Sequence, residues 1–225
     1  MRFSTTKDEA RQHGIKALVH ARGGMGKTTL CKTAPDPIII SAEAGLLALG
    51  DVEIPTIVIE TFADVDEAYR FVAYSEHAKH FQTVCLDSIT EIAEQCLSAE
   101  KGKSKDPRKA YGEMQDEVLK RIKWFRDLVG KHVYLSCKQE SVKDEVSGVT
   151  LYGPRMPGRQ VGPQLPYLFD EVFSLEIGRT ADNVDFRYLR TRTGLQYEAK
   201  DRSGKLDEFE PPDLGHIFNK ILGTT

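Results

Sequence analysis

The chain has 225 residues, a formal net charge of −3 at pH 7 and four cysteines that show no C-x-x-C spacing. This length suits one α/β domain with a sizeable core and disfavours a second full domain. The slightly acidic balance excludes a globally basic surface, so nucleic acid would have to be bound by local basic loops. The sequence has no apolar run long enough to span a membrane and no signal-peptide core, which predicts a cytoplasmic protein with reduced cysteines.

The first predicted elements are an apolar strand over 15–19 and a helix that ends near Pro35. Between them lies the segment ARGGMGKTT, residues 21–29, which fits the P-loop pattern G-x-x-x-x-G-K-[ST] except that Ala21 replaces the first glycine. Small residues let consecutive backbone N–H groups curl around phosphate oxygens at a helix N-terminus. We therefore expect ATP and Mg²⁺, with Lys27 at the β/γ-phosphates and Thr28 at the metal. The predicted nucleotide-binding residues here are Arg22, Gly23, Gly24, Met25, Gly26, Lys27, Thr28 and Thr29.

Further apolar runs alternate with helical patterns along the chain. Strands are predicted over 38–41, 56–59, 83–87 and 132–137, and the longest helix over about 107–129. This alternation favours a mostly parallel P-loop NTPase sheet with helices on both faces.

After about residue 177 the pattern changes, and we expect an antiparallel hairpin of 185–190 with 195–200, followed by a helix over 214–222. The whole chain, 1–225, is read as one domain. It has an N-terminal extension at 1–14, a long Gly/Pro-rich loop without regular structure at 139–166 and a C-terminal part at 180–225.

Two carboxylates follow predicted strands at positions suited to phosphate chemistry. Asp87 ends the strand 83–87, as in a Walker B arrangement, and is a candidate metal ligand. Glu43 follows the strand after the P-loop helix, where a carboxylate can orient and deprotonate a water molecule that attacks the γ-phosphate. A surface glutamate at a helix start is an equally simple interpretation of Glu43.

Lys200 and Arg202 leave a predicted strand on one face, because alternate residues of a strand share a face. Two cations placed in this way suit the γ-phosphate of a neighbouring subunit, where an arginine stabilises the charge of the transition state. A solvated turn with charged residues is the simpler alternative.

Together these segments resemble the RecA-type ATPase core, from Ile15 to about Arg202. Residues 41–44 look like the strand that carries the catalytic glutamate of that family, and 86–88 look like its Walker B end. Residues 199–204 are similar to the Lys-x-Arg finger strand of DnaB-type replicative helicases. In the fourth strand, either Lys138 or Gln139 takes the place of the γ-phosphate sensor of the family, and both stay candidates.

The closest resemblance is to the small phage single-strand-annealing recombinases of the Sak group, which consist of a RecA core alone. It implies a Mg²⁺-dependent ATPase that binds single-stranded DNA and supports annealing or homologous recombination. It also implies a homo-oligomer, either a ring or a filament, with a single-strand-binding protein as a further partner.

Two segments lie where RecA-type proteins carry DNA-binding loops. Cations suited to phosphates occur in both, and Tyr152 is suited to stacking on a base. By composition alone the first is a solvated loop, and Asp144 and Glu145 weaken the second. The candidates are Lys101, Lys103, Lys105, Arg108 and Lys109 in the first segment, and Tyr152, Arg155 and Arg159 in the second.

Two other functions compete with a DNA-dependent ATPase. An ATP-switched module would use the nucleotide to control assembly or loading of another protein, without a response to DNA. A small-molecule kinase is disfavoured because the sequence shows no acceptor site and no arginine-rich lid.

Overall fold

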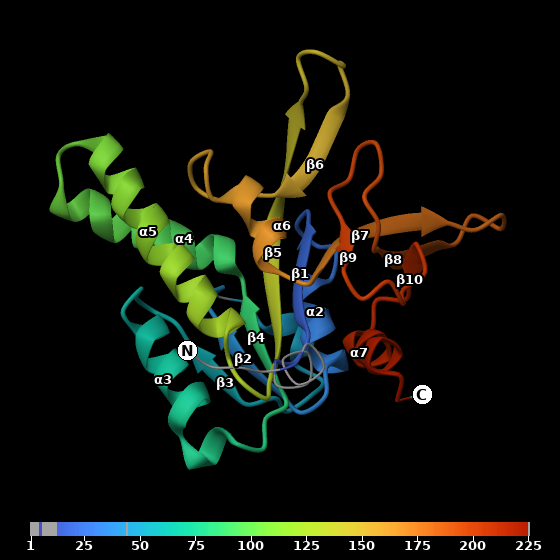
Figure 1. The fold of residues 1–225 in the computed structure, drawn as a ribbon, viewed down its shortest axis with the longest axis horizontal. Coiled ribbons are helices and arrows are strands. Elements are labelled where there is room, and N and C mark those ends of the chain that lie inside the picture. The colour runs from blue at the N-terminus through green and yellow to red at the C-terminus, as the bar shows by residue number, and fades with distance from the viewer. Residues whose placement is uncertain (1–4, 6–12, 44, 225) are drawn as a thin grey trace.

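A computed structural model describes residues 5, 13–43 and 45–224 (Figure 1). Most of the expected N-terminal extension, together with Ala44, therefore lies outside the described residues. In the part of the chain that is described, no helix is long and apolar enough to cross a membrane. All four cysteines are buried and unpaired, as expected for reduced core residues.

The centre of the structure is a ten-stranded sheet in which the P-loop strand β1 lies between two parallel neighbours. The strands that run parallel to one another are, in spatial order, β7 (Glu171–Arg179), β1 (Lys16–Ala21), β5 (His132–Lys143), β4 (Thr83–Asp87), β2 (Pro37–Ser41) and β3 (Thr56–Val58). Antiparallel strands extend this set at β7 and β5, namely β6 (Thr150–Pro154), β8 (Asp185–Arg190), β9 (Lys200–Asp201) and β10 (Phe209–Glu210).

Helices cover both faces of the sheet, so the expected architecture of a mostly parallel sheet between two helical layers, with antiparallel strands in the C-terminal part, is confirmed. Alternate residues of the buried strands point into two separate clusters: Ile38 and Ile40 pack on one side, Ile39 on the other. Strands buried on both faces have continuous apolar sequences for this reason. The first face is covered by α3 (Asp64–Tyr74), α4 (Ile89–Lys103) and α5 (Pro107–Arg126), the second by α2 (Lys27–Leu30) and α7 (Leu214–Leu222).

Local capping residues define where several helices begin and end. Ser88 accepts a hydrogen bond from the N–H of Glu91 at the start of α4, and Asp106 caps α5 just before Pro107. The expected terminal helix is present as α7, capped by Asp213. Short turns complete the chain: η1 (Cys31–Thr33), η2 (Leu47–Leu49), η3 (Glu76–Ala78), η4 (Gly162–Gln164) and α6 (Leu165–Leu168).

The prediction of a long loop without regular structure at 139–166 is wrong for 139–154, whereas residues 155–161 do lack helix and strand. Strand β5 continues to Lys143 and pairs with β6 in an antiparallel hairpin that projects from the sheet (Figure 1). The turn is formed by Asp144, whose side chain accepts the N–H of Val146, and by Gly148 at φ 71°. Asp144 and Gly148 therefore mark one tight turn, and the residues of β5 and β6 on either side of it are extended.

The predicted pairing of 185–190 with 195–200 is also wrong. Strand β8 pairs with the preceding strand β7 through a turn at 180–184, in which Asn183 takes a left-handed conformation. Most of 195–200 is not in a strand; of this segment only Lys200, the first residue of β9, pairs, and its partner is Val172 of β7. The longest helix ends at Arg126, before the expected end at about 129, and Val129 is exposed.

Candidate nucleotide-binding site

The P-loop connects β1 to α2. Gly24 has φ 74° and Gly26, the N-cap residue of α2, has φ 102°, conformations that favour glycine. A Cβ atom added at Gly23 or Gly24 would meet no atom within 4 Å. The loop therefore has room for a phosphate chain at the N-terminus of α2, as its sequence predicts.

Lys27 folds back over this loop. Its ammonium donates to the carbonyl oxygens of Ala21 at 3.1 Å and Arg22 at 3.2 Å. Burial lowers its pKa, and the carboxylates of Glu43 and Asp87 counteract that shift. The ammonium is thus held beside the loop by two backbone contacts that an anion can replace.

Asp87 occupies the C-terminal end of β4 and faces Thr28. The Thr28 hydroxyl donates to Asp87 Oδ2 at 2.6 Å, and the Ser136 hydroxyl donates to Oδ1. Burial raises the pKa of this carboxyl group, while the two hydroxyl donors lower it. A carboxylate and a hydroxyl oxygen are ligands that Mg²⁺ accepts, so these residues fit the expected metal position.

Ser136 was not predicted from the sequence, although a serine inside the apolar run 133–137 of β5 is a visible signal. The parallel register of β4 and β5 aligns Leu86 with Leu135 and so brings Ser136 beside Asp87.

Glu43 lies at the same edge of the sheet, two residues after the end of β2. The Ser41 hydroxyl donates to the Glu43 carbonyl oxygen at 3.0 Å and fixes the backbone there. The register aligns Ser41 with Asp87, and the Glu43 carboxylate is close enough to affect the titration of Lys27 and Asp87. The carboxylate therefore shares one site with the P-loop lysine and Asp87.

The two sensor candidates in the middle of β5 point in different directions. Lys138 donates to Glu91 on α4 at 2.8 Å and lies 3.6 Å from Glu94. Gln139 Nε2 lies 3.3 Å from Nδ1 of His20 and 3.5 Å from the hydroxyl of Ser174. Lys138 is thus ion-paired with α4, whereas Gln139 contacts polar side chains of β1 and β7.

Lys200 and Arg202 have partners within their own chain. The Lys200 ammonium donates to the carbonyl oxygens of Pro166 and Phe169, both at 2.5 Å, and burial lowers its pKa. Arg202 pairs with Asp170 at 2.8 Å and its side chain remains 58% exposed. Of the two cations, Arg202 is therefore the more accessible to another molecule.

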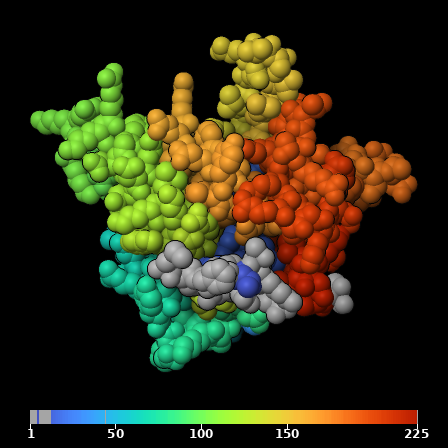
Figure 2. All heavy atoms as spheres, in the orientation of Figure 1, coloured from blue at the N-terminus to red at the C-terminus, as the bar shows by residue number. Residues whose placement is uncertain are grey.

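The candidate DNA-binding residues fall in two regions, one at the α4–α5 end and one at the β5–β6 hairpin and the segment after it; the α4–α5 end and the hairpin project separately (Figure 2). The first is not a flexible loop: Lys101 and Lys103 end α4, and Arg108 and Lys109 begin α5. The five cations are all exposed, and Lys103 is paired with Glu100 at 2.7 Å.

The second projection is the β5–β6 hairpin. Tyr152 lies on β6, and Arg155 and Arg159 follow it with exposed side chains.

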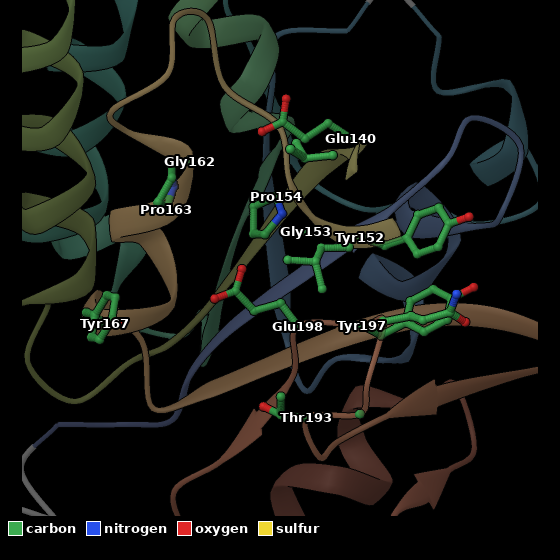
Figure 3. Close-up of a pocket in the computed structure, with 14 residues that line it drawn as sticks. Glu140, Tyr152, Gly153, Pro154, Gly162, Pro163, Tyr167, Thr193, Tyr197 and Glu198 are labelled. Atoms are coloured by element: carbon green, nitrogen blue, oxygen red, sulfur yellow. The ribbon is translucent and has the colours of Figure 1, made fainter. Parts of the chain in front are cut away.

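Tyr152 lines a cavity of about 490 Å³ beneath the hairpin (Figure 3). Its ring stacks on Tyr197 with centroids 4.8 Å apart, and Tyr167 lines the opposite side with 82% of its surface exposed. Glu140 and Glu198 also line the cavity, and burial raises the pKa of both carboxyl groups. The site therefore combines aromatic surfaces with two acids, and Tyr197, Tyr167 and Glu198 were not among the predicted residues.

Comparisons with known proteins agree with this P-loop site. No curated protein matches the sequence. Among solved structures, a KaiC-like protein of the archaeon Pyrococcus horikoshii OT3 has a TM-score of 0.48 at 16% identity, covering 84% of each chain. An ATPase of the type III secretion system of pathogenic bacteria has a TM-score of 0.49 at 14% identity, covering 73% of this chain and 51% of that one. The chain thus spans about half the length of the second protein, and neither likeness bears on function.

A family model described as an AAA domain matches residues 13–203, a range that contains the P-loop, Glu43, Asp87 and the C-terminal cations. The match covers most of the chain and all the described nucleotide-site residues. The chain therefore belongs to the AAA domain family and is a P-loop ATPase.

Proposed function

We propose that this ATPase uses Mg·ATP, binds single-stranded DNA and supports annealing or homologous recombination as a homo-oligomer in the cytoplasm. The convergence of Thr28, Asp87 and Glu43 on one edge of the sheet supports the nucleotide chemistry. The resemblance to phage Sak-group recombinases supports the DNA-dependent role.

In this proposal the P-loop amides and Lys27 hold the phosphates, and Thr28 and Asp87 hold Mg²⁺. Bound Mg·ATP supplies the phosphoanhydride bond that is cleaved and a metal that neutralises phosphate charge. Glu43 orients a water molecule and takes its proton, because its carboxylate acts on both Lys27 and Asp87 and has no role in holding the metal. Ser136 holds Asp87 in place through its hydrogen bond to Oδ1. Lys138 and Gln139 remain the two candidates for sensing the γ-phosphate.

Arg202 is the proposed cation for the nucleotide of a neighbouring subunit, since only its surface pair with Asp170 has to break. Lys200 is the second cation of the motif, and its bonds to two backbone carbonyls hold β9 against the chain. A ring or a filament would bring this edge of one subunit to the P-loop of the next.

Single-stranded DNA is proposed to contact the two projections, with phosphates on the cations of α4, α5, Arg155 and Arg159. Tyr152 and its stacked partner Tyr197 offer aromatic surface to a base. The pair is joined to the strand that leads into the P-loop: Glu198 directly follows Tyr197, and its carbonyl oxygen lies 2.7 Å from Nε2 of His20 on β1. A DNA contact at this pair would therefore lie beside the nucleotide site.

One observation favours a second function, an ATP-switched oligomeric module without DNA dependence. Glu140 and Glu198 place two acids in the same cavity as Tyr152, and acids repel DNA phosphates. Such a cavity also suits a basic segment of a protein partner, including a single-strand-binding protein.

The test is phosphate release from Mg·ATP with and without oligo(dT), using Lys27→Ala and Glu43→Gln as variants. We expect release to rise with oligo(dT) and to be lost in both variants, while Glu43→Gln still binds ATP. Release that does not respond to oligo(dT) would support the ATP-switched module and contradict the DNA-dependent function.

A further inference from the structure

Arg187 lies on β8, on the face of the β7–β8 hairpin that turns toward the P-loop. Two residues further along the strand, Leu189 is opposite Leu175, and both are buried in the cluster that contains Met25 and Leu30. Alternate residues of a strand share a face, so Arg187 points to the same side as Leu189. The P-loop and the start of α2 therefore lie on the side to which Arg187 points.

The distance between Arg187 and the P-loop is short. A Cβ atom added at Gly26 would lie 3.8 Å from Cδ and from Nε of Arg187. Gly26 is the N-cap of α2 and directly precedes Lys27. The guanidinium of Arg187 thus reaches the backbone turn in which phosphates are expected to bind.

Arg187 is exposed, and its guanidinium has no hydrogen-bond or ion-pair partner among the described residues. The other two arginines of the hairpin are paired: Arg179 with Asp185 at 2.7 Å, and Arg190 with Glu176 at 2.8 Å. Two of the three guanidinium groups are therefore ion-paired with carboxylates, and the third, that of Arg187, lies beside the expected phosphate-binding turn. A guanidinium binds phosphate oxygens through two parallel hydrogen bonds, so its geometry matches the expected ligand.

We propose that Arg187 binds the phosphate groups of the nucleotide held by the P-loop of its own chain. The inference rests on the proposed binding of Mg·ATP and adds a cation from within the chain, whereas Arg202 is proposed to act on a neighbouring subunit. The β7–β8 hairpin then forms one wall of the nucleotide site, since its paired strands carry Arg187 at a fixed register.

The test is calorimetric binding of a non-hydrolysable ATP analogue and of inorganic tripolyphosphate, both with Mg²⁺. The variants are Arg187→Ala, Arg187→Lys and Lys27→Ala, with Arg179→Ala as the matched control from the same hairpin. We expect Arg187→Ala to weaken both ligands by about tenfold, the loss of one charge-assisted contact, and Arg187→Lys to weaken them less. Arg179→Ala should bind like the unmodified protein. Arg187 is exposed, so thermal unfolding of the unliganded variants should be unchanged.

Three results would overturn the inference in distinguishable ways. If Arg187→Ala weakens the ATP analogue but not tripolyphosphate, Arg187 contacts the base or ribose and the phosphate assignment is wrong. If Lys27→Ala abolishes binding while Arg187→Ala binds normally, the P-loop site stands and the inference alone fails. If the unmodified protein binds neither ligand, the proposed function fails together with the inference.

Discussion

Replacing Glu171 by glutamine should change how protein stability depends on pH. Glu171 is the first residue of β7, opposite Asp201 of β9, and only 1% of its surface is exposed. One oxygen accepts the N–H of Ser203 at 3.2 Å, while Oε2 has no hydrogen-bond partner among the described residues. Burial, and then the charge of Asp201, raise the pKa of Glu171 from 4.5 to about 8.

The direction of the effect follows from the raised pKa. The unfolded chain releases the Glu171 proton near pH 4.5, whereas the folded chain keeps it until about pH 8. The contribution of the protonated Glu171 to folding stability is therefore fully present below pH 4.5 and is lost as the pH rises toward 8. At about 1.36 kcal/mol per pH unit, the loss between pH 5 and pH 7.5 is about 3 kcal/mol. Glutamine has no proton to release, so Glu171→Gln should not show this loss.

The assay is urea unfolding of both proteins at pH 5 and pH 7.5. The free energy of unfolding of Glu171→Gln, relative to the unmodified protein, should increase by about 3 kcal/mol between these values. Glu145→Gln, in the exposed turn of the β5–β6 hairpin, is the control and should give the same difference at both pH values. An equal difference for Glu171→Gln at both pH values would refute the assignment of a protonated, buried Glu171.

Three further outcomes are expected. Ser136→Ala removes a hydrogen-bond donor to Asp87 and should raise the magnesium concentration at half-maximal hydrolysis by about tenfold in a magnesium titration. An unchanged midpoint would contradict the role of Ser136. Burial lowers the pKa of His20 to about 4, so stability should be lost as the pH falls from 6.5 to 4; His20→Gln should show a smaller loss in acid unfolding curves, and equal slopes would exclude a neutral, buried His20. Tyr152→Ala should weaken binding of a fluorescent oligonucleotide by about tenfold while Tyr152→Phe binds normally, and equal binding of all three proteins would remove Tyr152 from the DNA surface.

The P-loop and the parallel strands could be predicted from the sequence because their signals are local. Glycines, Lys27 and Thr28 occur at fixed spacing, and Asp87 directly follows an apolar run. Ser136 could not be assigned in this way, because its role depends on the register of β5 against β4.

Strand pairing in the C-terminal half is harder to predict because two places in the sequence can form a turn. Thr193-Gly194 lies between the two segments expected to pair, but the chain turns at Asn183 instead, so that β8 pairs with β7. Arg187 approaches Gly26 only through this pairing, with 160 residues of sequence between them. A single sequence contains no local signal for such a contact.

The segment 196–198 is held by hydrogen bonds from two directions. The N–H of Tyr152 donates to the Gln196 carbonyl at 2.6 Å, and the N–H of Glu198 donates to the Tyr152 carbonyl at 2.9 Å. On its other side, the Glu198 carbonyl lies 2.7 Å from Nε2 of His20, the residue directly before the P-loop segment. For protein engineering, a tag or fluorophore is therefore best placed in the exposed turns at 144–148 or 180–184, because an insertion at 196–198 would separate the hairpin from the nucleotide site.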